Sequence, residues 1–254
     1  MVMDFAAVFA EQYSYWLLAA IVLMAVLYSS VGHGGASGYL AAMALWGLAP
    51  HEMRPAALAM NILVTSWLLL RFQPYKLMPY KLFWPLVLAS TPAAFMGGLW
   101  QIDAASYHLL VGVLLGLAAF KMLVSTNTAE HIQLPAQWQV LVVGLLLGFS
   151  AGLTGIGGGV FLSPILLIFG WCSVRQSTAI AAGFILLNSI AGLAGYTLSQ
   201  QPWPVGSGWL MLAAFGGCLL GAELASHRAS STTLRKLLSA VLLIASAKMI
   251  YSAI

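Results

Sequence analysis

Two glycine clusters are the residues in this sequence whose types and spacing most clearly suggest chemistry. Residues 152–164 read G-L-T-G-I-G-G-G-V-F-L-S-P, and residues 31–36 read V-G-H-G-G-A. Both clusters interrupt apolar stretches, where each interior glycine costs a helix about 1 kcal/mol relative to alanine. Inside a membrane, a break of this kind is tolerated only where the backbone is buried in protein or lines a polar cavity. Each cluster is therefore a candidate turn at a binding site.

A helix that begins directly after such a turn points its free backbone N–H groups at the turn. Two inverted copies would aim two helix N-termini, each with about half a positive charge, at one point near the membrane midplane. Such a point binds anions, and glycine lets an oxyanion touch the backbone. The same glycines also allow two hairpins to cross closely without a ligand, and both interpretations remain open. The candidate binding glycines are Gly34, Gly35, Gly157, Gly158 and Gly159.

Polar side chains within otherwise apolar segments are further candidates for this site. Burying such groups in a membrane costs free energy, so their presence there indicates a function. The candidates are Asn61, Thr65, Asn188 and, beside the second turn, Thr154. Hydrogen bonding between helices is the alternative explanation for all four.

Three basic residues are candidates for separate functional roles. His33 stands where the second cluster has Ile156, and its imidazole can donate to an anion, carry a coupled proton or serve a structural role. Arg54 and Arg175 precede long apolar segments at opposite membrane faces, where they are candidates for interfacial anchoring or for gating.

Motifs for catalysis are absent from the sequence. It contains no G-x-S-x-G, H-E-x-x-H or nucleotide-binding loop, and its acidic residues are scattered. We expect no enzymatic activity, no metal site and no cofactor.

The composition identifies the elements that must position these residues. Of 254 residues, 61% are hydrophobic and 6% are charged, against roughly 25% charged in an average soluble domain. The apolar runs are continuous rather than alternating, which predicts an all-α polytopic membrane protein in contact with lipid and not a β-barrel. The net charge of +4 reflects basic residues at segment ends, so nucleic acid is not an expected partner.

The apolar residues form ten segments in two sets of five. The segments are 16–31, 36–48, 55–72, 82–100, 104–124, 140–153, 159–171, 177–199, 205–226 and 234–254. A shift of 123 residues takes Gly32 onto Gly155, Gly47 onto Gly170 and Thr65 onto Asn188. We predict an internal duplication, with residues 1–128 and 129–254 as two repeats joined by the polar linker 125–137. An odd number of segments per repeat makes their topologies inverted.

The segment after each glycine cluster, 36–48 or 159–171, has 13 residues. Such a helix rises about 20 Å, whereas the hydrocarbon core is about 30 Å thick. Each is predicted either to re-enter the membrane as a broken helix or to span it tilted. With the N-terminus outside, eight of the ten basic residues fall on the inner side.

The two clusters, V-G-H-G-G-A and T-G-I-G-G-G-V-F-L-S-P, each open a short apolar segment that precedes a charged turn and a long span. In these residues the chain resembles the sulfite exporter TauE/SafE family of bacterial inner-membrane proteins, over nearly its whole length. The resemblance implies a multi-pass secondary transporter of small sulfur-containing anions, such as sulfite or the organosulfonate sulfoacetate. The first cluster departs from the second at His33 and Ala36, which leaves open whether both turns bind equally.

The expected mechanism is alternating access, with one half rocking against the other around a midplane site. Export is the expected direction, and His33 is the candidate for proton coupling. The alternative is a passive anion channel in which the same turns form a filter. The sequence does not indicate an oligomeric state.

Overall fold

The computed structural model describes residues 15–30, 32–72, 74–124, 132–133, 135–201, 203–204, 206–224 and 231–254. Over these ranges the chain forms ten α-helices and one short 3-10 helix, with no strand. The α-helices are α2 (Tyr15–Ser29), α3 (Ala36–Leu45), α4 (Pro50–Phe72), α5 (Tyr80–Leu99), α6 (Ala104–Val124), α7 (Gln137–Thr154), α8 (Gly159–Ile168), α9 (Val174–Leu198), α10 (Ser207–Leu224) and α11 (Ser231–Tyr251); the 3-10 helix is η1 (Pro74–Leu77).

Five of these helices are long and apolar enough to cross a membrane, namely α4, α5, α6, α7 and α9. Every predicted apolar segment contains one helix, so the expectation of an all-α polytopic membrane protein is confirmed. One basic residue counted in the topology argument, Arg228, lies outside the described ranges, as does most of the linker 125–137.

Helix bounds and backbone geometry agree with the shift of 123 residues. Shifting α3 by that amount gives the bounds of α8, Gly159–Ile168. Gly32 and Gly155, which end α2 and α7, have φ of +77° and +84°. Gly47 and Gly170, which follow α3 and α8, have φ of +78° and +64°. Residues with side chains rarely adopt this left-handed region, so all four positions favour glycine.

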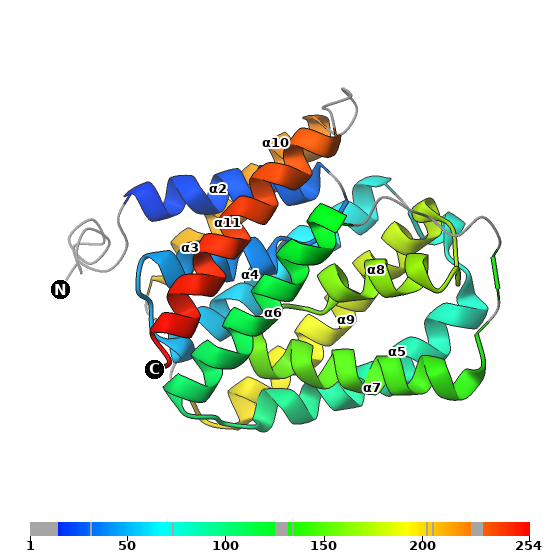
Figure 1. The fold of residues 1–254 in the computed structure, drawn as a ribbon, viewed down its shortest axis with the longest axis horizontal. Helices are drawn as coiled ribbons and strands as arrows, with labels where there is room; N and C mark the ends of the chain where they lie inside the picture. Colours follow the sequence, from blue (N-terminus) through cyan, green and yellow to red (C-terminus); the bar gives the residue numbers. More distant parts are fainter. Residues whose placement is uncertain are drawn as a thin grey trace.

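The two short helices are ten residues each, or about 15 Å, and so are too short to cross a bilayer. Each follows a longer helix, but α3 packs against α2, α4 and α11, whereas α8 packs against α9. Figure 1 shows α2 beginning at the left-hand end of the molecule and α7 beginning at the right-hand end. In this view α2 and α7 therefore run toward the middle of the molecule from opposite ends, and the inverted topology stays a prediction.

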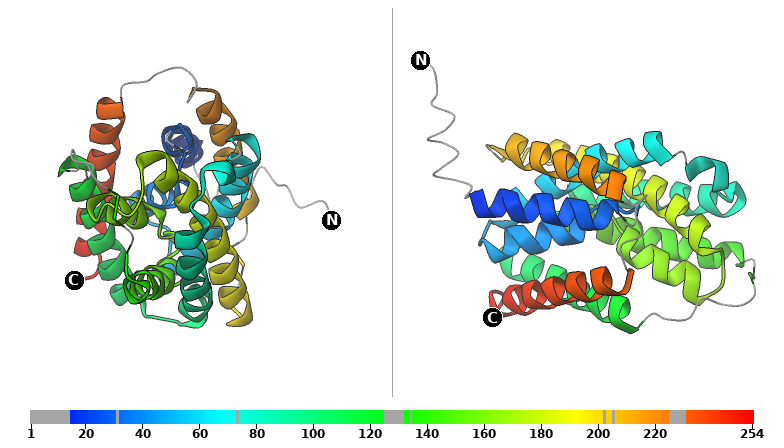
Figure 2. Two further views of the ribbon diagram at one scale, coloured as in Figure 1. Left: turned by 90° about the vertical axis from the view of Figure 1, so that its right-hand side faces the viewer. Right: turned by 90° about the horizontal axis from the view of Figure 1, so that it is seen from above.

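Each half of the sequence contributes a helix that packs mainly against helices of the other half. Helix α5 packs on α7 and α9, and its counterpart α10 packs on α2 and α4. Helices α6 and α11 pack on one another, and Figure 2 shows α2 beside α10. We call α2, α3, α4 and α10 the first bundle and α5, α7, α8 and α9 the second bundle. Each bundle mixes helices from both halves.

The hydrophobic core follows the same division. One cluster of buried residues joins the first bundle to α6 and α11, and a second cluster lies within α5, α7, α8 and α9. The two bundles meet where α4 crosses α9.

Glycines at four-residue spacing allow the close packing of α5 on α7. A Cβ on Gly144 would lie 2.7 Å from the carbonyl oxygen of Leu86, and Cβ atoms on Gly148 and Gly152 would collide with the backbone of Ser90 and Ala94. These small residues therefore form a helix-packing stripe on α7.

A substitution within this stripe should separate the two helices. We expect Gly148→Ala to lower the free energy of unfolding by about 1 to 3 kcal/mol, because backbone cannot yield to the added methyl group. Gly216→Ala is the matched control, since nothing lies within 4 Å of its Cβ position. Thermal unfolding in detergent measures both, and equal stability of the two variants would contradict the packing argument.

Candidate functional site

Asn61 lies where the two glycine turns meet. A Cβ on Gly34 would be 2.8 Å from Asn61 Oδ1, and a Cβ on Gly157 would overlap Asn61 Nδ2. Asn61 is fully buried in the middle of α4. Its amide therefore contacts both turns, one from each half of the sequence. We call this region, around Asn61, Gly34 and Gly157, the glycine crossing.

The two turns differ in backbone conformation at the glycine crossing. In the second turn, Gly157 and Gly158 have φ of +75° and +76°, values at which any side chain is strained. In the first turn, Gly35 has φ of −101°. There glycine is needed for space, because a Cβ on Gly35 would lie 2.5 Å from the ring of Tyr39. The two clusters thus need glycine for different reasons.

Both short helices begin within two residues of the glycine crossing. The N-cap residues are Gly35 for α3 and Gly158 for α8, and neither makes a side-chain cap. The first backbone N–H groups of a helix have no partner within the helix. Two N-termini, with about half a positive charge each, consequently lie near Asn61.

Polar groups from α4 and α9 surround the same point. Asn61 Nδ2 donates to Ser189 Oγ at 3.3 Å, and Thr65 Oγ1 donates to the Asn61 carbonyl at 2.6 Å. Thr65 also lies next to Gly34. All three side chains are fully buried.

Asn188 lies on α9, one helical turn from Ile185, whose side chain contacts Gly34, Gly157 and Gly159. Asn188 is fully buried, and neither Nδ2 nor Oδ1 has a hydrogen-bond partner in the described part of the chain. Asn61 Oδ1 likewise lacks one. A buried unpaired polar group costs about 1 to 3 kcal/mol. Leaving these atoms unpaired therefore lowers the stability of the folded protein, and it leaves them free to form hydrogen bonds with a ligand.

His33 joins the two bundles. Its Nε2 lies 2.9 Å from Ser163 Oγ, on α8. His33 precedes Gly34 directly, so the imidazole lies at the edge of the glycine crossing. The sequence analysis did not identify Ser163 as a partner, although it is one of two hydroxyl residues within the second cluster, with Thr154.

The remaining predicted residues lie around the turns without contacting Asn61. Gly158 lies against the ring of Phe184, and Gly159 lies against Ile185. Thr154 Oγ1 donates to the Ser150 carbonyl and accepts from the Ile156 backbone N–H. Its hydroxyl is thus used within its own helix end and turn.

Arg54 fastens α4 to the ends of two other helices. Its guanidinium donates to the carbonyls of Gly152 at 2.9 Å, Trp100 at 3.0 Å and Gly98 at 2.7 Å, and also to Gly97. These carbonyls belong to the C-terminal ends of α5 and α7, where the helix dipole is negative. No carboxylate in the described ranges pairs with Arg54. Helix dipoles and carbonyls replace a counter-ion.

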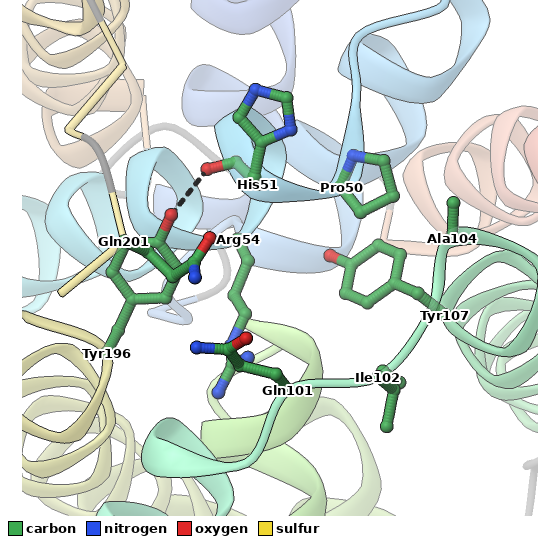
Figure 3. Close-up of a pocket in the computed structure, with 9 residues that line it drawn as sticks. All are labelled: Pro50, His51, Arg54, Gln101, Ile102, Ala104, Tyr107, Tyr196 and Gln201. Carbon is green, nitrogen blue, oxygen red and sulfur yellow. Dashed lines mark hydrogen bonds between the residues drawn. The ribbon is translucent and has the colours of Figure 1, made fainter. Parts of the chain in front are cut away.

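A pocket of about 180 Å³ opens above Arg54. Figure 3 shows Arg54 between Tyr196 and Tyr107, with Gln101 at the wall. The Tyr196 hydroxyl donates to the His51 carbonyl, and the Tyr107 hydroxyl donates to the Thr154 carbonyl. Sequence reasoning missed both tyrosines, because an aromatic residue in an apolar segment carries no signal of its partner.

The loop between α5 and α6 forms one side of this pocket. It includes Asp103, whose carboxylate accepts from the Ser106 backbone N–H at 2.9 Å, and this bond keeps the pKa of Asp103 below its usual range. Arg175, in contrast, is exposed in the first turn of α9 and takes no part in the pocket or the glycine crossing.

Comparisons with known proteins agree with this architecture. A family model described as sulfite exporter TauE/SafE matches residues 17–249. The probable membrane transporter protein y4hK of Sinorhizobium fredii is 32% identical over 240 residues, covering 92% of this chain and 97% of that protein. The probable membrane transporter protein YjnA of Bacillus subtilis is 24% identical over 255 residues, covering 91% and 99%.

No solved structure gives a significant match. Both relatives carry the names of transporters rather than of enzymes. The family match spans most of the chain and includes both glycine turns, Asn61 and Asn188. The chain is thus a multi-pass membrane protein that belongs to the sulfite exporter TauE/SafE family.

Proposed function

We propose that this protein is a secondary transporter of a small sulfur-containing anion, such as sulfite or an organosulfonate of the sulfoacetate type. We also propose that it lies in the bacterial inner membrane and that it exports its substrate. The observation that supports it is the glycine crossing, where two helix N-termini without side-chain caps lie near the buried Asn61 amide, whose Oδ1 has no partner in the described part of the chain. A buried oxyanion would satisfy these donors.

Alternating access would move the two bundles rather than the two sequence halves. The first bundle holds His33 and Asn61, and the second holds Ser163 and Ser189, so the bonds between these pairs cross the boundary between bundles. Arg54 crosses the same boundary from α4 to α5 and α7. Arg54 is therefore the stronger candidate for a gate, and the exposed Arg175 for an interfacial anchor.

Transport into proteoliposomes tests the proposal. Sulfite and sulfoacetate uptake should saturate with concentration, and Gly157→Ala should reduce it strongly, since the methyl group would overlap Asn61 Nδ2. Gly208→Ala provides the control, because its Cβ position is open. A flux that rises linearly and ignores the Gly157 substitution would favour the passive channel.

Proton coupling through His33 is a separate part of the proposal. We expect His33→Ala to alter the rate of transport driven by a proton gradient, because the imidazole connects the bundles at Ser163. An unchanged rate and pH profile in this variant would remove His33 from the coupling mechanism.

A further inference from the structure

The two short helices, α3 and α8, end with the same backbone hydrogen bonds, but a lysine binds only one of these ends. The N–H groups of residues 46, 47 and 48 donate to the carbonyls of residues 42, 44 and 43, and the shift of 123 residues gives the same three bonds after α8. This pattern does not use the carbonyls of Leu45 and Ile168, the last residues of the two helices. Lys248 Nζ donates to the Leu45 carbonyl at 2.6 Å. The Ile168 carbonyl has no partner in the described part of the chain.

The other half of the sequence contains a lysine that corresponds to Lys248. A shift of 127 residues takes the bounds of α6, Ala104–Val124, onto those of α11, Ser231–Tyr251, and takes Lys121 onto Lys248. Lys248 is half-buried, whereas Lys121 is exposed and has no partner among the described residues. The sequence thus contains a short helix and a matching lysine twice, and only one of the two contacts is formed in the described ranges.

The packing of the four helices differs in the same way. Helix α11 packs on α3, whereas α6 makes only slight contact with α8. Gly112 of α6 lies against Ile250 of α11, and Gly116 lies against Ser246, so the two helices pack in antiparallel directions. Their two lysines therefore lie toward opposite ends of the pair. Figure 1 shows α3 toward the left of the molecule and α8 toward the right, so each end of the pair has a short helix on its own side.

We propose that the contact of Lys248 with α3 alternates during transport with a contact of Lys121 with α8. In the second state, α6 packs on α8, Lys121 Nζ donates to the Ile168 carbonyl, and Lys248 releases the Leu45 carbonyl. Each ammonium stabilises the negative C-terminal end of the helix that it binds. Because the same kinds of group form both contacts, the two states are close in free energy, as alternating access requires. The inference rests on the proposed function and identifies groups that distinguish its two states.

Distances between spin labels on α6 and beside α8 measure this exchange. The labels replace Leu123, which is exposed near the end of α6, and Phe169, which is exposed directly after α8. The full chain carries them in lipid vesicles, with Cys172 and Cys218 replaced by alanine so that no other thiol is labelled. We expect two distances, of which the shorter belongs to the state in which Lys121 binds α8. Circular dichroism and gel filtration confirm that each labelled chain is folded.

Removing the charge of either lysine should change the ratio of the short to the long distance in opposite directions. Lys248→Met should raise the ratio at least about threefold, because the α3 contact loses its ammonium, and Lys248→Glu should raise it further. Lys121→Met should lower it by a similar factor. The variant with both methionines should return the ratio to near that of the parent, which a purely structural role of Lys248 does not predict. Lys81→Met, at an exposed position in the first turn of α5, is the matched control and should leave the ratio unchanged.

The outcomes distinguish this inference from the proposed function. A single distance that no lysine variant alters, or a change in the same direction in Lys248→Met and Lys121→Met, would overturn the inference and leave an anion transporter in place. Uptake of sulfite and sulfoacetate by the parent chain is measured separately in proteoliposomes. Failure of both anions to be transported would overturn the proposed function, whereas the distances alone decide whether the two lysine contacts alternate.

Discussion

Replacing Asn188 with leucine should leave the protein at least as stable as the parent while reducing anion transport about 10- to 100-fold. The stability expectation follows because the Asn188 amide is fully buried and has no partner among the described residues. Removing such a group recovers a penalty of about 1 to 3 kcal/mol. The transport expectation follows because a hydrogen bond to a charged ligand contributes about 1.5 to 3 kcal/mol.

Thermal unfolding and initial rates of uptake measure the two effects in one preparation. Asn188→Thr is the informative second variant, since the shift of 123 residues aligns Asn188 with Thr65. The threonine hydroxyl replaces the amide as a hydrogen-bonding group, so this variant should retain part of the transport activity. Loss of stability in Asn188→Leu together with unchanged transport would identify Asn188 as a packing residue.

Replacing Arg54 with glutamine should have the largest effect on stability. The guanidinium donates to four backbone carbonyls at the ends of α5 and α7, and the substitution would leave these acceptors unpaired. We expect the free energy of unfolding to fall by about 3 to 5 kcal/mol. Arg54→Lys should lose less, because lysine keeps the charge but lacks the planar array of donors.

Arg175→Gln is the matched control for this prediction, because Arg175 is exposed and its removal should change stability by no more than about 0.5 kcal/mol. The proposed gating role of Arg54 is tested by a second measurement, the kinetics of transport. Arg54→Lys should change the rate at saturating anion but not the half-saturating concentration, since Arg54 is seven residues from Asn61 along α4. Equal stability of the Arg54→Gln and Arg175→Gln variants would show that the carbonyl contacts contribute little.

The sequence predicted the helices well because membrane burial leaves a strong signal. Apolar segment ends lie within five residues of the observed helix ends, and the glycine turns appear where the clusters break the apolar runs. Gly32 and Gly155, which the shift of 123 residues aligns, both have a positive φ. These features are local, so a short stretch of sequence contains them.

The contacts between distant helices were not predictable in the same way. The packing of α5 on α7 and of α10 on α2 depends on which backbone lies against the glycines of α7 and against Gly217 and Gly221 of α10, and the glycine spacing alone does not identify that backbone. The partners of His33 and Arg54 were missed for a related reason. Ser163 is 130 residues from His33, and the Arg54 acceptors are backbone carbonyls, which every residue possesses.

The central claim is that the anion binds at the glycine crossing, and one structure determination tests it most directly. Selenite resembles sulfite and contains a selenium atom whose anomalous scattering locates it without ambiguity. We predict a single selenium peak between Gly34 and Gly157, within hydrogen-bonding reach of Asn61 or Asn188. A peak in the pocket above Arg54, with none at the glycine crossing, would contradict the account and identify the crossing as a packing device.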